Sequence, residues 1–318
     1  MFETIIPQLN RGEKVGIFAH QSPDGDAMGS AYSLKLVLQS MGKEAEVFLL
    51  PNHDAMAYPL IKGKEPTGLC VGDCDLLVAV DCADARRLGD YQEIFTAHQN
   101  TVAIDHHITH QPFAKQRVVA DISSTCELMT VLYEEMGVPV TKDVAINLYT
   151  GIVCDTGNFK YSSVTPDTMH RAAHLIEKGI DFAGISKAVF NTKPRAYYGL
   201  MRKALDRLQF YMDGKVCVLW LSQQDFEEAE IDESMATGIV TLPTGIEGVE
   251  VGVYIRKRSE DEFKISLRSN RIVDVAEIAM VFGGGGHIRA AGYSAFHEDV
   301  ETVISRVLEE IEKRLGAE

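Results

Sequence analysis

The first half of the chain alternates short apolar segments with helical stretches, and this alternation limits the fold more than any other feature of the sequence. The apolar segments cover residues 15–20 (VGIFAH), 45–50, 76–81 (LLVAVD) and 102–105. An amphipathic stretch over residues 27–41 separates the first two. Continuous apolar strands joined by helices indicate a parallel sheet that is covered on both faces. We therefore expect an α/β domain with a parallel sheet.

Capping signals predict further helices after the fourth strand. Ser124 and Glu127 have the spacing of a capping box before a helix that ends near Gly137. Thr165 followed by Pro166 is typical of an N-cap and a first helical residue. Helices are also expected over residues 142–154 and 193–208, and the second of these is interpreted as a connecting helix.

The second half predicts a smaller α/β domain with a mixed sheet. The turn pair at residues 213–214 (DG) centres a hairpin over residues 210–221. Strands follow over 249–256, 263–268 and 293–296, with helices over 272–282 and 299–315 and a glycine loop at 283–286. The expected organisation is a first domain at residues 1–190, a helical connector at 191–208 and a second domain at 209–318.

Charge and composition exclude several classes of function. The net charge is −15, whereas proteins that hold long nucleic acids need a broad basic face that releases counterions. Basic residues outnumber acidic ones only locally, between residues 256 and 289, which suits a short anionic ligand. Neither a membrane-length apolar run nor a signal peptide is recognised. The six cysteines form no CxxC pair, so a cytoplasmic protein with reduced thiols is expected.

Acidic and imidazole side chains follow the strands of the predicted parallel sheet. They are His20, Asp24 and Asp26 after the first strand, Asp81 at the end of the third, Asp105, His106 and His107 at the end of the fourth, and Asp155 after the helix over 142–154. Ligands of open α/β sheets lie beyond the carboxyl ends of the strands. A single aspartate in such a place is usually a helix cap, but the joint occurrence indicates one shared site.

The chemistry of these side chains predicts divalent metal ions. Carboxylates mixed with imidazoles suit Mn²⁺, and also Mg²⁺, Co²⁺ or Zn²⁺. Without cations, so many carboxylates in one place would repel one another strongly. Two bound ions would neutralise them, and Mn²⁺ is the expected metal.

The order of these residues resembles that of the DHH phosphoesterase superfamily: HxxxDxD, then Asp, then DHH, then Asp. The segments SLRS at 266–269 and GGGGHIRAAG at 283–292 resemble the DHH-associated C-terminal domain. The resemblance covers essentially the whole chain. At this length the chain is most similar to the nanoRNase A type of oligoribonuclease, whose members also act on 3′-phosphoadenosine 5′-phosphate or linear di-adenylate.

The resemblance implies a role for each residue. One metal ion would be held by His20, Asp24 and Asp81, and the second by Asp26, Asp81, His106 and Asp155, so that Asp81 bridges the two. His107 would face the substrate phosphate, and Asp105 would orient an imidazole by accepting its proton. The substrate-binding residues would be Arg268, Ser269, Asn270, Gly284, Gly285, Gly286 and His287, because arginine and glycine-rich backbone both bind phosphate well.

The implied activity is hydrolysis of very short RNA to mononucleotides by water that the two metal ions activate. The first domain would cut and the second would hold a nearby phosphate, which would limit substrate length. The expected partners are short oligonucleotides or bisphosphorylated nucleotides, with no long nucleic acid and no membrane. Both a monomer and a homodimer stay open.

Other functions fit the same ligand set. A phosphatase for 3′-phosphoadenosine 5′-phosphate and a phosphodiesterase for linear di-adenylate or cyclic dinucleotides stay open. The sequence GGGGHIRAAG counts against an inorganic pyrophosphatase of the superfamily. A processive exonuclease of the RecJ kind would be longer, with additional nucleic-acid-binding modules. A non-catalytic nucleotide-binding regulator on the same fold is disfavoured by the intact ligand set.

Overall fold

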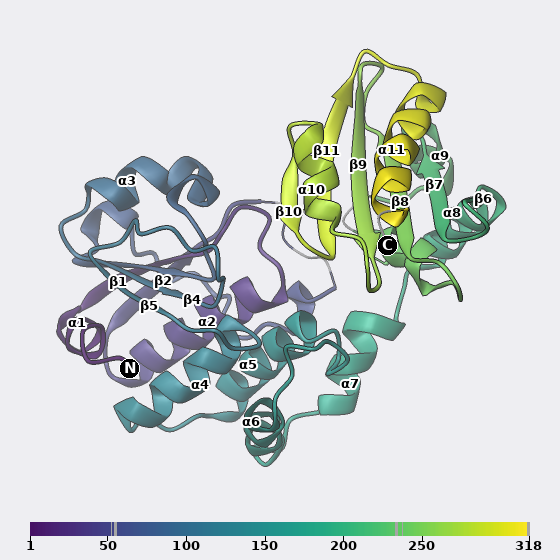
Figure 1. Cartoon of the computed structure of the whole chain (residues 1–318). Helices are drawn as coiled ribbons and strands as arrows, with labels where there is room; N and C mark the ends of the chain where they lie inside the picture. The colour runs from purple at the N-terminus through teal and green to yellow at the C-terminus, as the bar shows by residue number, and fades with distance from the viewer. Residues whose placement is uncertain (52, 54–55, 233–234, 237, 317–318) are drawn as a thin grey trace. The chain divides into compact units, whose positions relative to one another are not determined.

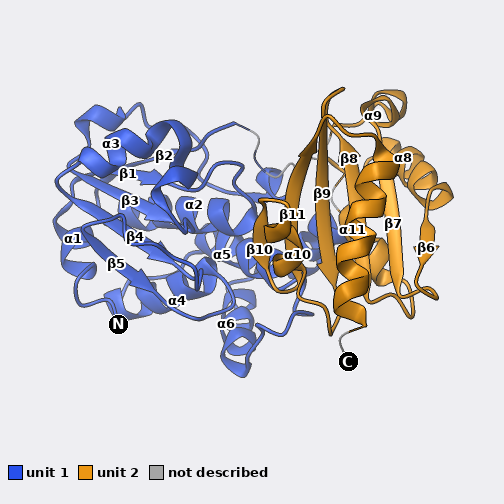
Figure 2. Cartoon of the chain, turned by 45° about the horizontal axis from the view of Figure 1, so that its top comes forward, with its two compact units in different colours: residues 1–192 blue, residues 193–318 orange. Residues whose placement is uncertain are grey.

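The computed structural model describes residues 1–51, 53, 56–232, 235–236 and 238–316. The chain divides into two compact units, residues 1–192 and residues 193–318 (Figure 2). Each unit has its own sheet and its own apolar core. The helix over residues 195–206 belongs to the second unit.

The first unit contains a five-stranded sheet in which every pair of neighbouring strands is parallel. The strand order is β2-β1-β3-β4-β5, which the labels of Figure 2 let the reader follow; Figure 1 shows the same unit from another side. The strands are β1 (Lys14–Phe18), β2 (Glu44–Phe48), β3 (Leu76–Val80), β4 (Thr101–Asp105) and β5 (Gln116–Val119). The four predicted strands and their parallel arrangement are confirmed, and β5 is an additional edge strand.

Helices cover both faces of this sheet, which explains why its strands are apolar throughout. One face packs against α1 (Ile6–Arg11), α2 (Gly25–Ser40), α4 (Thr125–Met136) and α5 (Lys142–Asp155). The other face packs against α3 (Gln92–Ala97) and the 3-10 segment Ala85–Tyr91. Two further helices, α6 (Pro166–Ile176) and α7 (Phe182–Ser186), complete the unit.

Helix α2 differs from the amphipathic helix that the sequence predicts. It is buried on nearly all sides because it packs against α4 and α5 as well as against the sheet. A Cβ atom on Gly29 would lie 2.5 Å from the carbonyl oxygen of Asn147, and one on Gly25 would lie 2.2 Å from Sγ of Cys154. These glycines therefore let α2 and α5 approach closely. The left-handed residue of the preceding turn is Ser22, with φ of 56°.

The start of α4 confirms only half of the predicted capping box. The Ser124 hydroxyl accepts a hydrogen bond from the backbone N–H of Glu127 at 3.0 Å. The Glu127 carboxylate does not return to the backbone of Ser124; it accepts hydrogen bonds from the hydroxyls of Ser123 and Thr168 instead. This buried carboxylate thereby links α4 to the first turn of α6, where Thr165 is the N-cap, as predicted.

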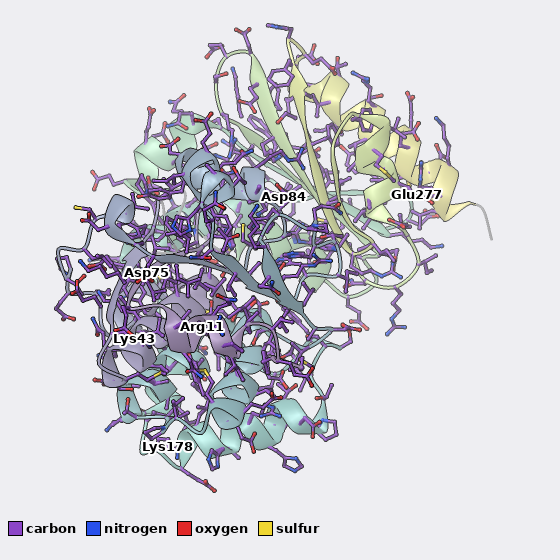
Figure 3. All side chains as sticks on the ribbon, turned by 90° about the vertical axis from the view of Figure 1, so that its left-hand side faces the viewer. Arg11, Lys43, Asp75, Asp84, Lys178 and Glu277 are labelled. Carbon is purple, nitrogen blue, oxygen red and sulfur yellow. The ribbon has the colours of Figure 1, made fainter. Side chains whose placement is uncertain are left out.

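The amino-terminal edge of the same sheet is closed by structural polar contacts (Figure 3). The Asp75 carboxylate accepts hydrogen bonds from the backbone N–H groups of Glu13 and Lys14, all at 3.1 Å. The Lys43 ammonium donates to the carbonyl groups of Asn10 and Gly12 at 2.9 and 2.7 Å. Asp75 at this edge thus stabilises the fold, whereas the buried Asp26, Asp81 and Asp105 lie at the opposite, carboxyl edge.

The second unit contains a six-stranded sheet of order β10-β11-β9-β8-β7-β6. The sheet is mixed, as predicted. The pair β7–β8 is parallel and the other pairs are antiparallel. The strands are β6 (Gln209–Tyr211), β7 (Val216–Leu221), β8 (Val251–Lys257), β9 (Glu262–Ser269), β10 (Gly285–His287) and β11 (Ala290–Phe296). The predicted hairpin is confirmed as β6–β7, whereas the end of the glycine run is a short strand instead of a loop.

Four helices cover this second sheet. Helices α10 (Val275–Val281) and α11 (Val300–Leu315) pack on one face, and α8 (Arg195–Asp206) and α9 (Gln223–Ala229) pack on the other. Helix α10 begins later than predicted because Asp274 caps it and the Glu250 carboxylate binds the backbone N–H groups of residues 271–273. Among the described helices, none has the length and apolar character needed to cross a membrane. All six cysteines are free thiols.

Candidate metal centre

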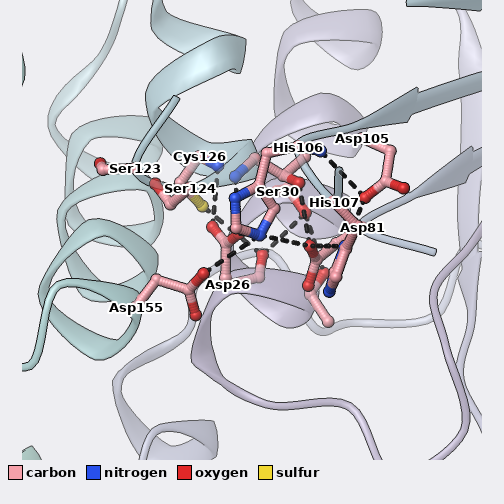
Figure 4. A network of polar contacts seen from close by, with 12 residues as sticks. Asp26, Ser30, Asp81, Asp105, His106, His107, Ser123, Ser124, Cys126 and Asp155 are labelled. Atoms are coloured by element: carbon pink, nitrogen blue, oxygen red, sulfur yellow. Dashed lines mark hydrogen bonds and ion pairs between the residues drawn. The ribbon is translucent and has the colours of Figure 1, made fainter. Parts of the chain in front are cut away.

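The site lies where the strand order of the first sheet changes direction. Strand β1 is flanked by β2 and β3, so the chain runs outward on both sides of it. His20 follows β1, Asp81 follows β3, and His106 follows β4. The carboxyl edge of the strands is the place where open α/β sheets bind ligands. Figure 4 shows Asp26, Asp81, His106 and Asp155 converging there.

All six predicted metal ligands come together at this edge. We call them the acid–imidazole cluster: His20, Asp24, Asp26, Asp81, His106 and Asp155. Their ligand atoms form overlapping groups, within which all atoms lie within 4.8 Å of one another. One group is His20, Asp24 and Asp81, a second is Asp26, His106 and Asp155, and a third joins Asp81 and His106 to His107. The first group matches one predicted ligand set, and Asp81 belongs to two groups.

Asp81 lies at the centre of the cluster. Its Oδ2 is 3.6 Å from Nε2 of His20, and its Oδ1 is 3.6 Å from Nε2 of His106. The Thr125 hydroxyl donates to Oδ1 at 2.9 Å. Asp81 has a φ of 53°, a left-handed conformation that few residues other than glycine, asparagine and aspartate adopt readily. This backbone geometry turns the carboxylate toward both imidazoles.

The two imidazoles of the cluster are oriented by backbone carbonyl groups. Nδ1 of His20 lies 2.8 Å from the carbonyl oxygen of Gln21, and Nδ1 of His106 lies 3.2 Å from that of Ile122. A carbonyl oxygen only accepts, so each Nδ1 carries the proton. A neutral ring in this orientation would present the lone pair of Nε2 to a metal ion, which is the tautomer that a metal ligand requires.

Helix termini hold the two acids that follow His20. Oδ1 of Asp24 caps α2 by accepting from the N–H groups of Asp26 and Ala27, both at 3.0 Å, while its Oδ2 lies 3.9 Å from Nε2 of His20. The buried Asp26 carboxylate accepts from the N–H groups of Thr125 and Cys126 at 2.6 and 2.8 Å. These are the first residues of α4, where free N–H groups and the helix dipole favour an anion.

Asp105 lies behind the cluster and holds two imidazoles. Its Oδ1 accepts from Nδ1 of His107 at 2.7 Å, and its Oδ2 accepts from Nδ1 of His110 at 2.6 Å. Burial opposes ionisation, but these two hydrogen bonds outweigh it and lower the pKa of Asp105 below its ordinary value. With Nδ1 engaged, Nε2 is the nitrogen of His107 that remains to face a ligand.

The acids of the cluster are held close together at a cost in charge repulsion. Burial, with repulsion from Asp81 and Asp155, raises the pKa of Asp24 to about 6, although 49% of its side chain is exposed. The same causes raise the pKa of Asp26 well above its ordinary value. Burial alone would lower the pKa of His106, but its hydrogen bond with Asp155 and the charges of Asp26 and Asp81 raise it to about 10.

These observations fit divalent cations. Repulsion among carboxylates and the raised pKa values of Asp24, Asp26 and Asp155 indicate a density of negative charge that protons alone offset poorly. Oxygen donors combined with two oriented imidazoles are the ligand set of a hard or borderline divalent metal ion. The residues present can therefore hold such an ion.

Metal affinity is expected to rise with pH. Ligands bind metal in their deprotonated forms, so ions compete with protons on Asp24 and His106. Each proton released on binding strengthens the apparent affinity about tenfold per pH unit. The folded-state pKa of Asp24 is raised to about 6. The contribution of Asp24 to the free energy of unfolding is therefore fully present below the pKa that Asp24 has in the unfolded chain. This contribution is lost as the pH rises through about 6. The free energy of unfolding of the metal-free protein therefore falls over the pH range in which the affinity for metal rises.

The measurement is the shift in Tm that Mn²⁺ causes at pH 5.5 and 7.5, together with calorimetric titration in buffers of different ionisation enthalpy. We expect a larger shift at pH 7.5 and a net release of protons. Equal shifts at the two pH values, with no proton release, would contradict this assignment of the cluster.

Replacing Asp105 by Asn tests its role as an orienting residue. An amide offers one acceptor oxygen, so either His107 or His110 would face an N–H group instead of an acceptor. We expect kcat/KM for the hydrolysis of very short RNA, the activity expected from the sequence, to fall about 10- to 100-fold. A loss of this size is usual when a group that orients a ligand is removed. Asp121→Asn, at an exposed position, is the matched control. An Asp105→Asn enzyme with the activity of this control would rule out the role.

The residues predicted to bind substrate lie in the second unit. Arg268 is in β9, with Gly252 and Ala290 as its register neighbours. The Ser269 hydroxyl donates to the carbonyl oxygen of Val273 at 2.6 Å, and the Asn270 amide donates to those of Thr244 and Val249. The last two side chains thus brace the loop between β9 and α10. Their role in substrate binding stays a prediction.

The glycine run and His287 form the edge of the second sheet. A Cβ on Gly284 would lie 2.2 Å from the carbonyl oxygen of Gly292, and one on Gly286 would lie 2.5 Å from that of Ala290. Close strand packing therefore requires these two glycines, whereas a Cβ on Gly285 would meet open space. His287 ends β10 and is exposed. A phosphate-binding role for this edge stays a prediction.

Two parts of the metal centre were not predicted. His110 shares Asp105 with His107, and nothing in the motif spacing marks it. The N-terminal residues of α4, Thr125 and Cys126, bind Asp81 and Asp26. The N-cap at Ser124 was the available signal for them, because a capped helix start presents free N–H groups that can bind a carboxylate.

Comparison with known proteins identifies the class to which this fold and site belong. Residues 14–152 match the DHH family N-terminal domain, and residues 213–314 match the DHHA1 domain. The chain belongs to the DHH family.

Among individual proteins, the chain is 32% identical over 309 residues to the bifunctional oligoribonuclease and PAP phosphatase NrnA of Thermus thermophilus, which covers 94% of this chain and 89% of the relative. It is 25% identical to the cyclic-di-AMP phosphodiesterase PdeA of Listeria monocytogenes, but spans only 45% of that protein. Among solved structures, an exopolyphosphatase-related protein from Bacteroides fragilis has a TM-score of 0.89 and 27% identity, over 98% of this chain and 95% of that one.

Proposed function

We propose that this protein is a Mn²⁺-dependent phosphodiesterase that hydrolyses very short RNA, about two to five nucleotides long, to mononucleotides. The observation that carries the proposal is the central position of Asp81, whose carboxylate oxygens lie 3.6 Å from Nε2 of His20 and 3.6 Å from Nε2 of His106. The similarity of the chain to an oligoribonuclease and PAP phosphatase over nearly the whole length of the chain supports the choice of substrate.

The residues of the cluster suit a pair of ions. His20, Asp24 and Asp81 would hold one ion, while Asp26, Asp81, His106 and Asp155 would hold the other. Divalent ions supply Lewis acidity, which lowers the pKa of water and offsets the charge of a phosphoryl group.

The chain's own residues would position the reaction. Asp105 keeps the Nδ1 proton of His107 in place, so that Nε2 faces the substrate. When His107 carries a proton on Nε2 as well, it can donate to a phosphoryl oxygen as negative charge develops there. Asp81 would fix the position of both ions through its left-handed backbone and through the Thr125 hydroxyl.

The bulk charge of the protein supports short substrates. A net charge of −15 opposes binding of a long polyanion, whereas Arg268 offers a local bidentate site for one phosphate. Arg268 is therefore proposed to hold one phosphate of a short substrate.

A second activity, removal of the 3′-phosphate of 3′-phosphoadenosine 5′-phosphate, is proposed for the same site. The relative from Thermus thermophilus is named for both activities. In both reactions water attacks phosphorus and the 3′-oxygen of a ribose leaves. The two substrates differ in whether the phosphorus also carries a second nucleoside, so the same cluster can serve both.

A panel of substrates with Mn²⁺ tests the proposal. It contains 5′-phosphorylated di-adenylate, 3′-phosphoadenosine 5′-phosphate, RNA ladders, short DNA, cyclic di-adenylate and pyrophosphate. We expect the highest kcat/KM for dinucleotides and other very short RNA. Preference for pyrophosphate, or no turnover of any phosphoester, would contradict the proposed function.

Arg268→Ala is expected to weaken the preference for short substrates. The loss of a bidentate phosphate contact should lower kcat/KM for the dinucleotide by about 10- to 100-fold. The weak activity on RNA of about 24 nucleotides should change little, because net repulsion already limits it. Arg271→Ala, which removes an exposed arginine nearby, is the control. Equal losses on both lengths would show that Arg268 does not select for length.

A further inference from the structure

The turn after α5 contains three consecutive left-handed residues beside the acid–imidazole cluster. Gly157, Asn158 and Phe159 have φ values of 56°, 60° and 62°. A left-handed phenylalanine is unusual because its Cβ crowds the backbone. Strained backbone of this kind persists only where the surroundings fix it, and it concentrates at functional sites.

Several contacts hold this turn in its strained form. The N–H of Asn158 donates to the carbonyl oxygen of Val153 at 2.8 Å, and the N–H of Phe159 donates to the Thr156 hydroxyl at 3.1 Å. The Ser186 hydroxyl donates to Oδ1 of Asn158 at 3.0 Å. The Phe159 ring packs against the first core, 6.1 Å from the ring of Tyr149. The turn is therefore rigid and well supported.

The consequence of the turn is the position of Tyr161. A Cβ on Gly157 would lie 2.4 Å from Cζ of Tyr161, and 2.6 and 2.8 Å from its Cε atoms. The ring therefore lies directly on the backbone of Gly157, where no other residue leaves room for it. Despite this packing, Tyr161 remains 58% exposed.

This exposed ring packs on a residue that lies close to the metal centre along the chain. Gly157 follows Asp155 by two residues, and Oδ2 of Asp155 lies 3.2 Å from Nε2 of His106. An aromatic ring supported on one side and open to solvent is the arrangement on which nucleobases stack. Stacking requires no base-specific hydrogen bonds, so it suits an enzyme that degrades RNA of any sequence.

We propose that Tyr161 is a stacking platform for the nucleobase next to the scissile phosphate. This inference rests on the proposed function, since it assumes a nucleotide at the acid–imidazole cluster. It adds a specificity residue: phosphoesters that carry a base beside the reacting phosphate gain affinity from Tyr161, and those without one do not.

Binding of two small ligands tests the platform independently of turnover. In the presence of Mn²⁺, calorimetry compares adenosine 5′-monophosphate with ribose 5-phosphate, which differ by the base. A stacked base contributes about 5- to 150-fold in affinity. We expect the wild type to prefer adenosine 5′-monophosphate by about tenfold or more, Tyr161→Phe to keep this preference, and Tyr161→Ala to lose it.

Tyr198 provides the matched control. It is 59% exposed, and Tyr198→Ala should keep the preference for the base. The proposal is overturned if Tyr161→Ala keeps the preference, or if it weakens both ligands equally, as a merely structural ring would. A wild-type protein that prefers the base but hydrolyses no phosphodiester would instead contradict the proposed function and retain the stacking site.

Discussion

Asp81→Asn is expected to abolish phosphodiester hydrolysis, with a fall in kcat of about 10³-fold or more. Asp81 lies between His20 and His106, which are proposed ligands of different ions, so its loss would affect both ions. Asparagine tolerates the left-handed backbone of this position, and the amide is nearly isosteric with the carboxylate. The variant should therefore fold, and the Tm shift caused by Mn²⁺ should be strongly reduced.

Asp84→Asn is the matched control for this experiment. Asp84 lies three residues further along the chain, outside the acid–imidazole cluster, and caps the segment Ala85–Tyr91 through the N–H of Arg86 (Figure 3). Asparagine caps helices as well as aspartate does, so activity and stability should stay near those of the wild type. An Asp81→Asn enzyme with a tenth or more of wild-type activity would remove Asp81 from the centre of the mechanism.

Exhaustive chelation is expected to eliminate activity while leaving the protein folded. The apolar cores of the two units contain none of the cluster residues, so the metal-free chain should keep its circular dichroism spectrum and a cooperative thermal transition. Readdition of Mn²⁺ should restore full activity. Activity that survives chelation, at metal levels verified by elemental analysis, would mean that water is activated in another way.

The sequence was sufficient to predict that these acidic and imidazole side chains come together, because their positions follow from the topology of the sheet. Once the strands are parallel, the residues after β1, β3 and β4 must share one edge of the sheet. The position of Asp155 could be predicted for a similar reason, since α5 ends at the same edge. The roles of these residues as ligands remain proposals that the predictions above test.

Features that depend on tertiary packing could not be predicted. Strands β5 and β10 are short edge strands with few apolar residues, so they lack the pattern that marks a buried strand. Helix α2 has a weak pattern because it is buried on several sides. The contact of His110 with Asp105 depends on how the chain turns after His107. The position of Tyr161 depends on the left-handed turn at residues 157–159, which Gly157 and Asn158 suggest in the sequence but Phe159 does not.

The most direct test of a two-ion mechanism is the rate of 5′-phosphorylated di-adenylate hydrolysis as Mn²⁺ is added stepwise to the metal-free enzyme, with bound metal counted in parallel. The enzyme concentration is kept well above the dissociation constants, so that each added equivalent binds. We expect the rate to rise steeply only as the second ion binds and to reach its maximum at two ions per chain. A maximum at one ion per chain, or hydrolysis without any, would contradict the assignment of Asp81 as the bridge between two metal ions.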